Sequence, residues 1–267
     1  MEAKRTIRNQ KRYRRKKAII RWSIWAFIFL AIGIMIGRIG RNNGTENHSQ
    51  ESQGNGIKGQ EVAEELERQV SSEPNPALDD WKIRLANKDN ILPSDFTVEL
   101  AKIDKIRKFD KRAIEDLQKM MNDLKKAGYT NIWVQSSYRS IQEQEKLYQG
   151  RVKEYMNKGK TQEEAERLTQ ETINKPGASD HNLGLAVDFN EVTSSFERLK
   201  GYQWLEDNAQ DYGFILRYPK DKVEITGVTY EPWHWRYVGQ EHATIIKEHH
   251  FCLEEYHSFL KNEKKQV

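Results

Sequence analysis

Two short segments, far apart in the chain, carry side chains that could bind a metal ion and hydrolyse a bond. Residues 179–188 read S-D-H-N-L-G-L-A-V-D, and residues 231–234 read E-P-W-H. Together they supply two imidazoles, a carboxylate and a further glutamate, the side-chain set of a catalytic zinc site with one coordination position left for water. The predicted chemistry is zinc-dependent hydrolysis by a metal-activated water, with Glu231 as general base and acid.

The spacing of these residues requires a bend in each segment. Side chains alternate between the two faces of a strand, so the odd offsets from His181 to Asp188 and from Glu231 to His234 would place each pair on opposite faces. A glycine inside the first segment and a proline inside the second permit such bends. We therefore expect the two pairs to converge only where the chain leaves regular strand geometry.

A lone histidine near a tryptophan is often an ordinary core residue, so each of these motifs taken alone is weak evidence for a metal site. A third segment strengthens the combination. Residues 136–148 read S-S-Y-R-S-I-Q-E-Q-E-K-L-Y and follow an apolar, strand-like stretch. A guanidinium recognises a free C-terminal carboxylate through paired charge-assisted hydrogen bonds. This position at a strand end favours a functional role for Arg139 over that of a solvated surface arginine.

The three segments resemble the S-x-Y-R-S, S-x-H-x-x-G-x-A-x-D and E-x-W-H motifs of the VanY-type D-alanyl-D-alanine carboxypeptidases, in the same order and with similar separations. The resemblance covers the chain from about Trp81 to its end. It implies one zinc ion per domain, held by His181, Asp188 and His234, with Glu231 as the catalytic acid and base. It also implies a substrate, because family members remove the terminal D-amino acid from peptidoglycan stem peptides.

The same resemblance assigns three residues to the substrate site. Arg139 would stabilise the tetrahedral oxyanion or bind the substrate carboxylate, and Gln144 and Ser179 match positions that line the site. Two other functions stay open: L,D-carboxypeptidase or endopeptidase action on the same peptides, and a zinc-stabilised, non-catalytic cell-wall binding module. Glu231 argues against the binding module, because a structural zinc site has no use for a carboxylate beside an open coordination position.

The N-terminal segment predicts a membrane anchor. Residues 1–21 hold ten Lys or Arg and one acid, and residues 22–37 form an uncharged apolar run. This pattern predicts a single-pass helix at 22–37 with a cytoplasmic basic tail and an extracytoplasmic catalytic domain. A cleaved signal peptide is the alternative, but no Ala-x-Ala-like site follows the run.

Charge and composition separate the remaining parts of the chain. The net charge of the whole chain is +4, and residues 1–21 alone carry +9. Residues 22–267 therefore carry −5. The basic tail therefore points to topology and anionic lipid, and no nucleic-acid partner is expected. Residues 38–80 contain no aromatic residue and predict a flexible, disordered linker. The single cysteine, Cys252, excludes an intrachain disulfide.

Residues 81–267 are expected to form one zinc D,D-carboxypeptidase domain of the α+β class. The resemblance implies a small, mostly antiparallel sheet with flanking helices, of the hedgehog and D,D-peptidase type. Hydrophobic periodicity predicts helices near residues 111–127, 141–158, 161–174, 196–212 and 241–262. Strands are predicted near residues 131–135, 186–190, 223–228 and 233–238, and the absence of a repeating βαβ rhythm argues for α+β.

Overall fold

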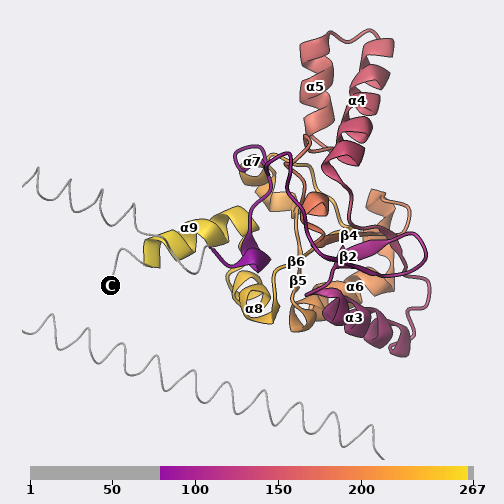
Figure 1. Cartoon of the computed structure of the whole chain (residues 1–267). Helices are drawn as coiled ribbons and strands as arrows, with labels where there is room; N and C mark the ends of the chain where they lie inside the picture. The colour runs from indigo at the N-terminus through magenta and orange to yellow at the C-terminus, as the bar shows by residue number, and fades with distance from the viewer. Residues whose placement is uncertain (1–78, 264–267) are drawn as a thin grey trace, which may run out of the picture. The chain divides into compact units, whose positions relative to one another are not determined.

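The computed structural model describes residues 79–263 of the chain, and its strands form two sheets. A two-stranded sheet pairs β1 (Leu100–Lys102) with β2 (Lys108–Asp110). A four-stranded sheet has the order β3-β4-β6-β5, with β3 (Val134–Ser136), β4 (Ala186–Phe189), β5 (Phe214–Leu216) and β6 (His234–Tyr237). Every strand pair within the described residues is antiparallel, and helices surround the sheets, so the domain is α+β (Figure 1).

Seven α-helices and five short 3-10 helices lie in the described part of the chain. The α-helices are α3 (Ile114–Lys126), α4 (Ile141–Asn157), α5 (Gln162–Gln170), α6 (Lys200–Asn208), α7 (Val223–Thr226), α8 (Gln240–His249) and α9 (Leu253–Glu263). The 3-10 helices are η1 (Trp81–Ile83), η2 (Asp180–Leu183), η3 (Ser194–Arg198), η4 (Ala209–Tyr212) and η5 (Lys220–Lys222).

The four-stranded sheet packs one face on the main hydrophobic core and carries its polar side chains on the other face. Along β4 and β6, alternate residues Val187, Phe189, Trp235 and Tyr237 join the main hydrophobic cluster, which also contains the buried side of α3 and Leu205 of α6. Period-two alternation directs the intervening residues to the other face. The polar side chains of the sheet are thereby gathered on the face opposite the main core.

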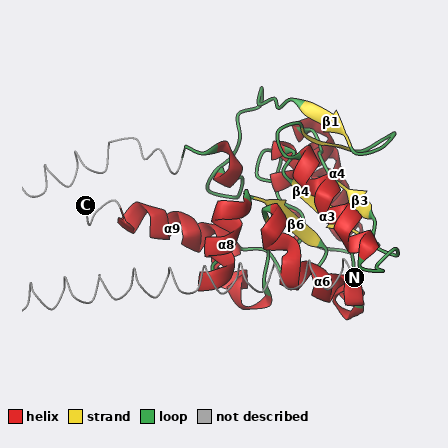
Figure 2. Ribbon diagram, turned by 90° about the horizontal axis from the view of Figure 1, so that it is seen from below, coloured by secondary structure: helices red, strands yellow, loops and turns green. Residues whose placement is uncertain are grey.

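A second apolar cluster joins β5 to the two C-terminal helices. Ile215 packs with Val238 and Ile246 of the α8 region and with Leu253 and Tyr256 of α9. Figure 2 shows α9 extending away from the side of the domain on which α3 and α6 lie. The C-terminal helices therefore pack against the β5 edge of the sheet rather than against the main core.

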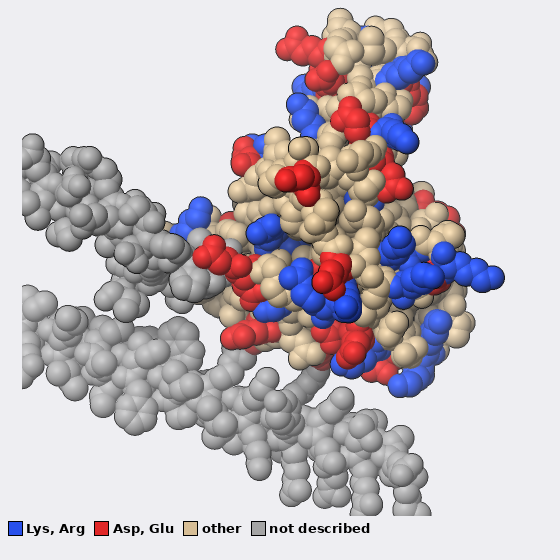
Figure 3. All heavy atoms as spheres, in the orientation of Figure 1, with Lys and Arg blue, Asp and Glu red and all other residues tan. Residues whose placement is uncertain are grey.

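Helices α4 and α5 lie side by side and form a hairpin that projects above the rest of the domain in Figure 1. A small cluster of Tyr148, Val152 and Ala165 packs between them. Lys and Arg are interspersed with Asp and Glu over the visible face of the domain, including this hairpin (Figure 3). Ion pairs four residues apart, such as Lys158 with Glu154 at 2.7 Å, are typical of solvated helices.

The structure confirms the predicted α+β class and corrects several element boundaries. The strand predicted at 223–228 is wrong, because Val223–Thr226 forms one helical turn that ends at Gly227 in a left-handed conformation. The single helix predicted at 241–262 is two helices, since His250, at φ 54°, ends α8 and the Glu255 carboxylate accepts from Cys252 N before α9. The helix predicted at 196–212 is divided into η3, α6 and η4, while β1, β2 and β5 were not predicted.

The membrane prediction concerns residues that the structure does not describe. Residues 1–21, 22–37 and all but the last two residues of the linker 38–80 lie outside 79–263. Between Asp79 and Glu263, no helix combines the length and the apolar character needed to cross a bilayer.

Candidate active site

Neighbouring strands place three polar side chains in one row on the polar face of the sheet. In the antiparallel register, Asp188 of β4 lies opposite His234 of β6 on one side and opposite Ser136 of β3 on the other. Residues directly opposite each other in neighbouring strands have side chains on the same face, within contact distance. Strand pairing alone therefore brings Asp188 and His234 together although 46 residues separate them.

The predicted bend delivers His181 to the same point. Ser179 caps η2, its hydroxyl accepting a hydrogen bond from the His181 backbone N–H at 3.3 Å. Gly184 ends η2 at φ 71°, a left-handed conformation that favours glycine, and its N–H donates to the His181 carbonyl at 3.1 Å. The chain then enters β4, so the odd offset between His181 and Asp188 is resolved by this turn.

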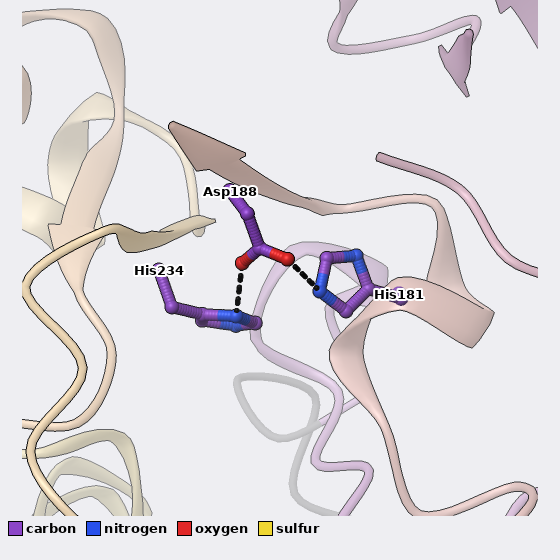
Figure 4. A group of neighbouring side chains, drawn as sticks. All are labelled: His181, Asp188 and His234. Carbon is purple, nitrogen blue, oxygen red and sulfur yellow. Dashed lines mark hydrogen bonds and ion pairs between the residues drawn. The ribbon is translucent and has the colours of Figure 1, made fainter. Parts of the chain in front are cut away.

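The side chains of His181, Asp188 and His234 converge in a buried cluster (Figure 4). His181 Nε2 is 3.1 Å from Asp188 Oδ2, and His234 Nδ1 is 2.9 Å from Asp188 Oδ1. One nitrogen of each imidazole and one carboxylate oxygen lie within 4.8 Å of one another. This donor set is the one that Zn²⁺ takes in catalytic sites with three protein ligands.

The hydrogen bonding of His181 fits a cation at this cluster. Its Nδ1 lies 2.7 Å from the carbonyl oxygen of Ser137, which only accepts, so Nδ1 carries the proton. Burial lowers the pKa of His181 further than the Asp188 carboxylate raises it, so the ring is neutral at pH 7 and Nε2 has a lone pair. A lone pair and a carboxylate oxygen that face each other are matched by a metal ion.

Glu231 lies beside the cluster without joining it. The chain turns at the following Pro232, where His234 N–H donates to the Glu231 carbonyl at 3.1 Å, so the odd offset is again bridged by a turn. Glu231 Oε2 is 3.8 Å from His234 Nδ1. Burial raises the pKa of Glu231 to about 8, with His234 opposing and Asp188 adding to this shift. A buried carboxyl group with a raised pKa is suited to accept and return a proton near neutral pH.

Arg139 lies just after the C-terminal end of β3 and is held there by two side chains. Its Nη1 donates to Gln144 Oε1 at 2.6 Å, and its Nη2 donates to Ser136 Oγ at 3.2 Å. The other end of the Gln144 amide donates to the Asn174 carbonyl at 2.6 Å. Burial lowers the pKa of Arg139, while Asp188, Glu143 and Glu231 oppose this shift. A guanidinium keeps its charge despite such a shift, so Arg139 places a fixed cation near the cluster.

The structure gives Gln144 and Ser179 supporting contacts near the site. Both are buried: Gln144 fixes Arg139, and Ser179 caps the turn that carries His181. A contact of either with substrate stays a prediction. Asn182 adds a further tie that the sequence did not suggest, because its Nδ2 donates to the Arg139 carbonyl at 2.8 Å.

Sequence reasoning missed a set of buried charged residues behind the cluster. Asp180 is fully buried between Arg217 and Arg236, and His234 Nε2 lies 3.8 Å from Asp180 Oδ2. The available signal was the alternation of His234 and Arg236 along one strand, which puts both on the polar face. The partner Arg217 lies 37 residues from Asp180 and has no local signature.

Comparison with known proteins identifies related sequences. The family model "VanY: D-alanyl-D-alanine carboxypeptidase" matches residues 106–240. A D-alanyl-D-alanine carboxypeptidase of Enterococcus faecalis is 40% identical over 177 residues, which are 66% of this chain and 66% of that protein. The chain thus spans just under two thirds of the length of this relative.

Solved structures share the fold. A variant of the vancomycin resistance D,D-pentapeptidase VanY from a VanB-type cassette, in complex with Zn(II), is 39% identical with a TM-score of 0.60, and the match covers 66% of this chain and 99% of that chain. The LdcB LD-carboxypeptidase is 34% identical with a TM-score of 0.57, over 67% of this chain and 88% of that one. The matched region thus includes nearly all of the VanY chain.

Proposed function

Since the chain belongs to the VanY family of D-alanyl-D-alanine carboxypeptidases, we propose that it is a zinc-dependent carboxypeptidase that removes the C-terminal D-alanine from peptidoglycan stem peptides. The observation that carries this proposal is the buried convergence of His181, Asp188 and His234 with Glu231 beside them. Three donors that leave a coordination position open, with a non-ligand carboxylate beside them, are a set that can carry out metal-assisted hydrolysis.

His181, Asp188 and His234 are the residues that would hold one zinc ion per domain. The related VanY structure in complex with Zn(II) supports the choice of metal. The chemistry supplied by a bound zinc ion is Lewis-acid polarisation of the scissile carbonyl and activation of water. The protein's own contribution is to fix the donors: Ser137 orients His181, and strand pairing aligns Asp188 with His234.

Glu231 is the proposed general base and acid. It takes the proton from the attacking water and returns it to the nitrogen of the departing D-alanine, which leaves as a neutral amine. Burial favours this exchange because it keeps the carboxyl group from being held permanently in the ionised state. Glu231 is therefore protonated and deprotonated once in each turnover.

Arg139 is proposed to bind the terminal carboxylate of the substrate or the oxyanion that forms at the scissile carbonyl. An exopeptidase must recognise a free C-terminus, and a guanidinium already held by Gln144 and Ser136 loses little freedom on binding. Gln144 and Ser179 are proposed to line the substrate site and to keep Arg139 and His181 in place.

A second candidate is L,D-carboxypeptidase action on the same peptides, which the likeness to the LdcB LD-carboxypeptidase favours. Endopeptidase action on the same cell-wall peptides is a further variant of this chemistry. A non-catalytic zinc-stabilised module fits less well, because it gives no role to the raised pKa of Glu231.

Incubation of the purified protein with pentapeptide stems, tetrapeptide stems and a cross-linked peptide, with product masses as the readout, tests the proposal. Loss of one alanine from the pentapeptide supports D,D-carboxypeptidase action. Loss of a residue from the tetrapeptide alone supports the L,D alternative, and cleavage inside a cross-linked peptide supports an endopeptidase. No cleavage of any of the three by zinc-loaded protein would leave only the binding module.

The proposed site of action is the outer face of the cell membrane. The ten basic residues of 1–21 before the apolar run 22–37 support a single-pass anchor with a cytoplasmic N-terminus. The composition of residues 38–80 supports a linker that lets the catalytic domain reach the peptidoglycan.

A further inference from the structure

A chain of buried charged groups leads from the proposed metal site to the C-terminal helix, and the catalytic steps do not use it. Asp180 Oδ2 accepts from Arg217 Nε at 2.8 Å, and Asp180 Oδ1 accepts from Arg236 Nη1. Arg217 donates its two remaining nitrogens to Glu254 of α9, at 2.9 and 2.6 Å. The side chains of Asp180, Arg217 and Arg236 are completely buried.

The end of this chain nearest the metal site faces one particular nitrogen of His234. His234 Nε2 is buried and has no hydrogen-bond partner in the described part of the chain. Asp180 Oδ2 lies 3.8 Å from it. When His234 binds zinc through Nδ1, the ring proton resides on Nε2 and needs an acceptor. An approach of about 1 Å from the observed 3.8 Å would bring the two groups to the roughly 2.7–2.9 Å of a charge-assisted hydrogen bond.

We propose that Asp180 orients His234 by accepting the hydrogen bond from its Nε2, and that Glu254 of α9 holds Asp180 in place through Arg217. Both acids are thus positioning residues for the zinc ligand, and the C-terminal helix is part of the support of the active site. This inference rests on the proposed ligation of zinc by His234. It adds one residue outside the matched family region 106–240, because Glu254 lies beyond it.

The energetics of burial explain why Glu254 is needed for this arrangement. Arg217 lies between two acids, and removal of either leaves a buried guanidinium partly unpaired, which is costly. Without Glu254, two nitrogens of Arg217 lose their acceptor, and the arginine that holds Asp180 is no longer fixed by α9. Arg236 cannot replace it, because its other nitrogens already donate to the carbonyls of Lys82, Arg84 and Tyr237.

The test compares zinc release from full-length variants. Asp180→Asn keeps the size of the side chain and removes its charge, and we expect zinc affinity to fall by about 10–100-fold, the range seen for groups that support metal ligands. Glu254→Gln should also weaken zinc binding and accelerate zinc release, but by a smaller factor than Asp180→Asn. Glu255→Gln is the matched control, because this neighbouring acid of α9 pairs with Lys222 at 3.0 Å and lies outside the chain of charges. Its zinc release should be unchanged.

The measurements are the rate of zinc transfer to a chelator, the visible spectrum of the cobalt-substituted protein and thermal unfolding. The proposal expects an altered cobalt spectrum in Asp180→Asn and Glu254→Gln, and less than additive effects in the double variant. If Asp180→Asn does not fold, Glu254→Gln against Glu255→Gln decides the question. Equal zinc release from Glu254→Gln and Glu255→Gln, at equal melting temperature, would overturn the role of α9.

The same assay separates this inference from the proposed function. Wild-type zinc affinity in folded Asp180→Asn, with zinc lost in His234→Ala, would reject the role of Asp180 and leave the ligand set intact. Full zinc occupancy in His234→Ala would instead reject the ligand set itself.

Discussion

At the scale of single residues, the two histidines of the site are in opposite electrostatic surroundings. Burial and the nearby Arg139 lower the pKa of His181, against the influence of Asp188. Burial also acts against a charged His234, but the nearby carboxylates of Asp180 and Asp188 outweigh it and raise the pKa of His234 to about 9. Without metal at pH 7, His181 is therefore neutral and ready to bind, whereas His234 carries a proton that zinc must displace.

The first prediction concerns the pH dependence of zinc binding. Because the pKa of His234 in the metal-free protein is about 9, the protonated form predominates below that pH and competes with zinc. Apparent zinc affinity should rise by about tenfold per pH unit from about pH 6 to about pH 8, with at least one proton released per ion. Isothermal titration in two buffers of different ionisation enthalpy measures this release. A flat affinity over that interval would contradict the assignment.

The second prediction separates catalysis from metal binding. Glu231→Gln keeps the size of the side chain but cannot accept a proton, so turnover should fall by at least the ~10²–10⁴-fold attributed to general acid and base catalysis. Zinc content and substrate binding should persist, because Glu231 is not a proposed ligand. Metal analysis and stem-peptide hydrolysis measure the two effects. Near-wild-type hydrolysis by this variant would reject Glu231 as the general base and acid, even with the zinc site intact.

The third prediction concerns the shape of the charge at Arg139. Arg139→Ala should reduce kcat/KM by about 10²–10³-fold, the effect of removing one oxyanion-stabilising group. Arg139→Lys should recover only part of this loss, because a compact ammonium cannot reproduce the paired hydrogen bonds of the guanidinium. Steady-state kinetics on a stem peptide and on its C-terminal amide distinguish carboxylate recognition from oxyanion stabilisation. Full activity in the lysine variant would show that charge alone is sufficient.

At the scale of elements, the site depends on where regular structure stops. Asp188 and His234 are aligned by strand pairing, whereas His181 and Glu231 reach the cluster through the η2 turn and the turn at Pro232. At Gly184, a Cβ atom would lie 3.3 Å from the backbone nitrogen of Asp110. The turn that separates the first two proposed ligands therefore leaves little room for a side chain.

The fourth prediction tests this turn. Gly184→Ala should lower the free energy of unfolding by about 1–2 kcal/mol, the cost of a left-handed conformation in a non-glycine residue. It should also weaken zinc binding, because His181 and Asp188 flank the turn. Gly128→Ala is the control: Gly128 is left-handed too, at φ 98°, but a Cβ atom there meets nothing within 4 Å. Urea unfolding and zinc titration should show stability loss in both variants and weaker zinc binding only in Gly184→Ala.

The sequence predicted elements and site residues where the signal is local. The motif residues lie in short segments, and the bends between His181 and Asp188 and between Glu231 and His234 followed from parity of spacing. Strand β5 is only three residues long and shows no periodicity, and the β-branched residues of 223–226 favoured a strand although the chain makes one helical turn there. The link from Asp180 to Glu254 was missed because it joins three distant segments through tertiary contacts alone.

At the scale of the whole molecule, the N-terminal segment and the rest of the chain carry net charges of opposite sign. Residues 1–21 hold a net charge of +9, whereas residues 22–267 total −5, and both signs are interspersed on the visible face of the domain (Figure 3). A basic segment attracts anionic lipid at the inner leaflet and resists translocation. The Lys and Arg residues that precede the apolar run therefore support the proposed orientation, with the catalytic domain outside.

The last prediction tests this topology. Protease added to intact protoplasts should cut between residues 38 and 78 and release an active fragment, because the apolar run 22–37 is expected to hold the chain in the bilayer with the domain outside. A cytoplasmic marker enzyme should survive the same treatment, and zinc-dependent hydrolysis of a pentapeptide should appear in the supernatant. A domain protected until lysis would place it in the cytoplasm. A domain already free in the medium, with a new N-terminus after Gly37, would show instead that the segment is a cleaved signal peptide.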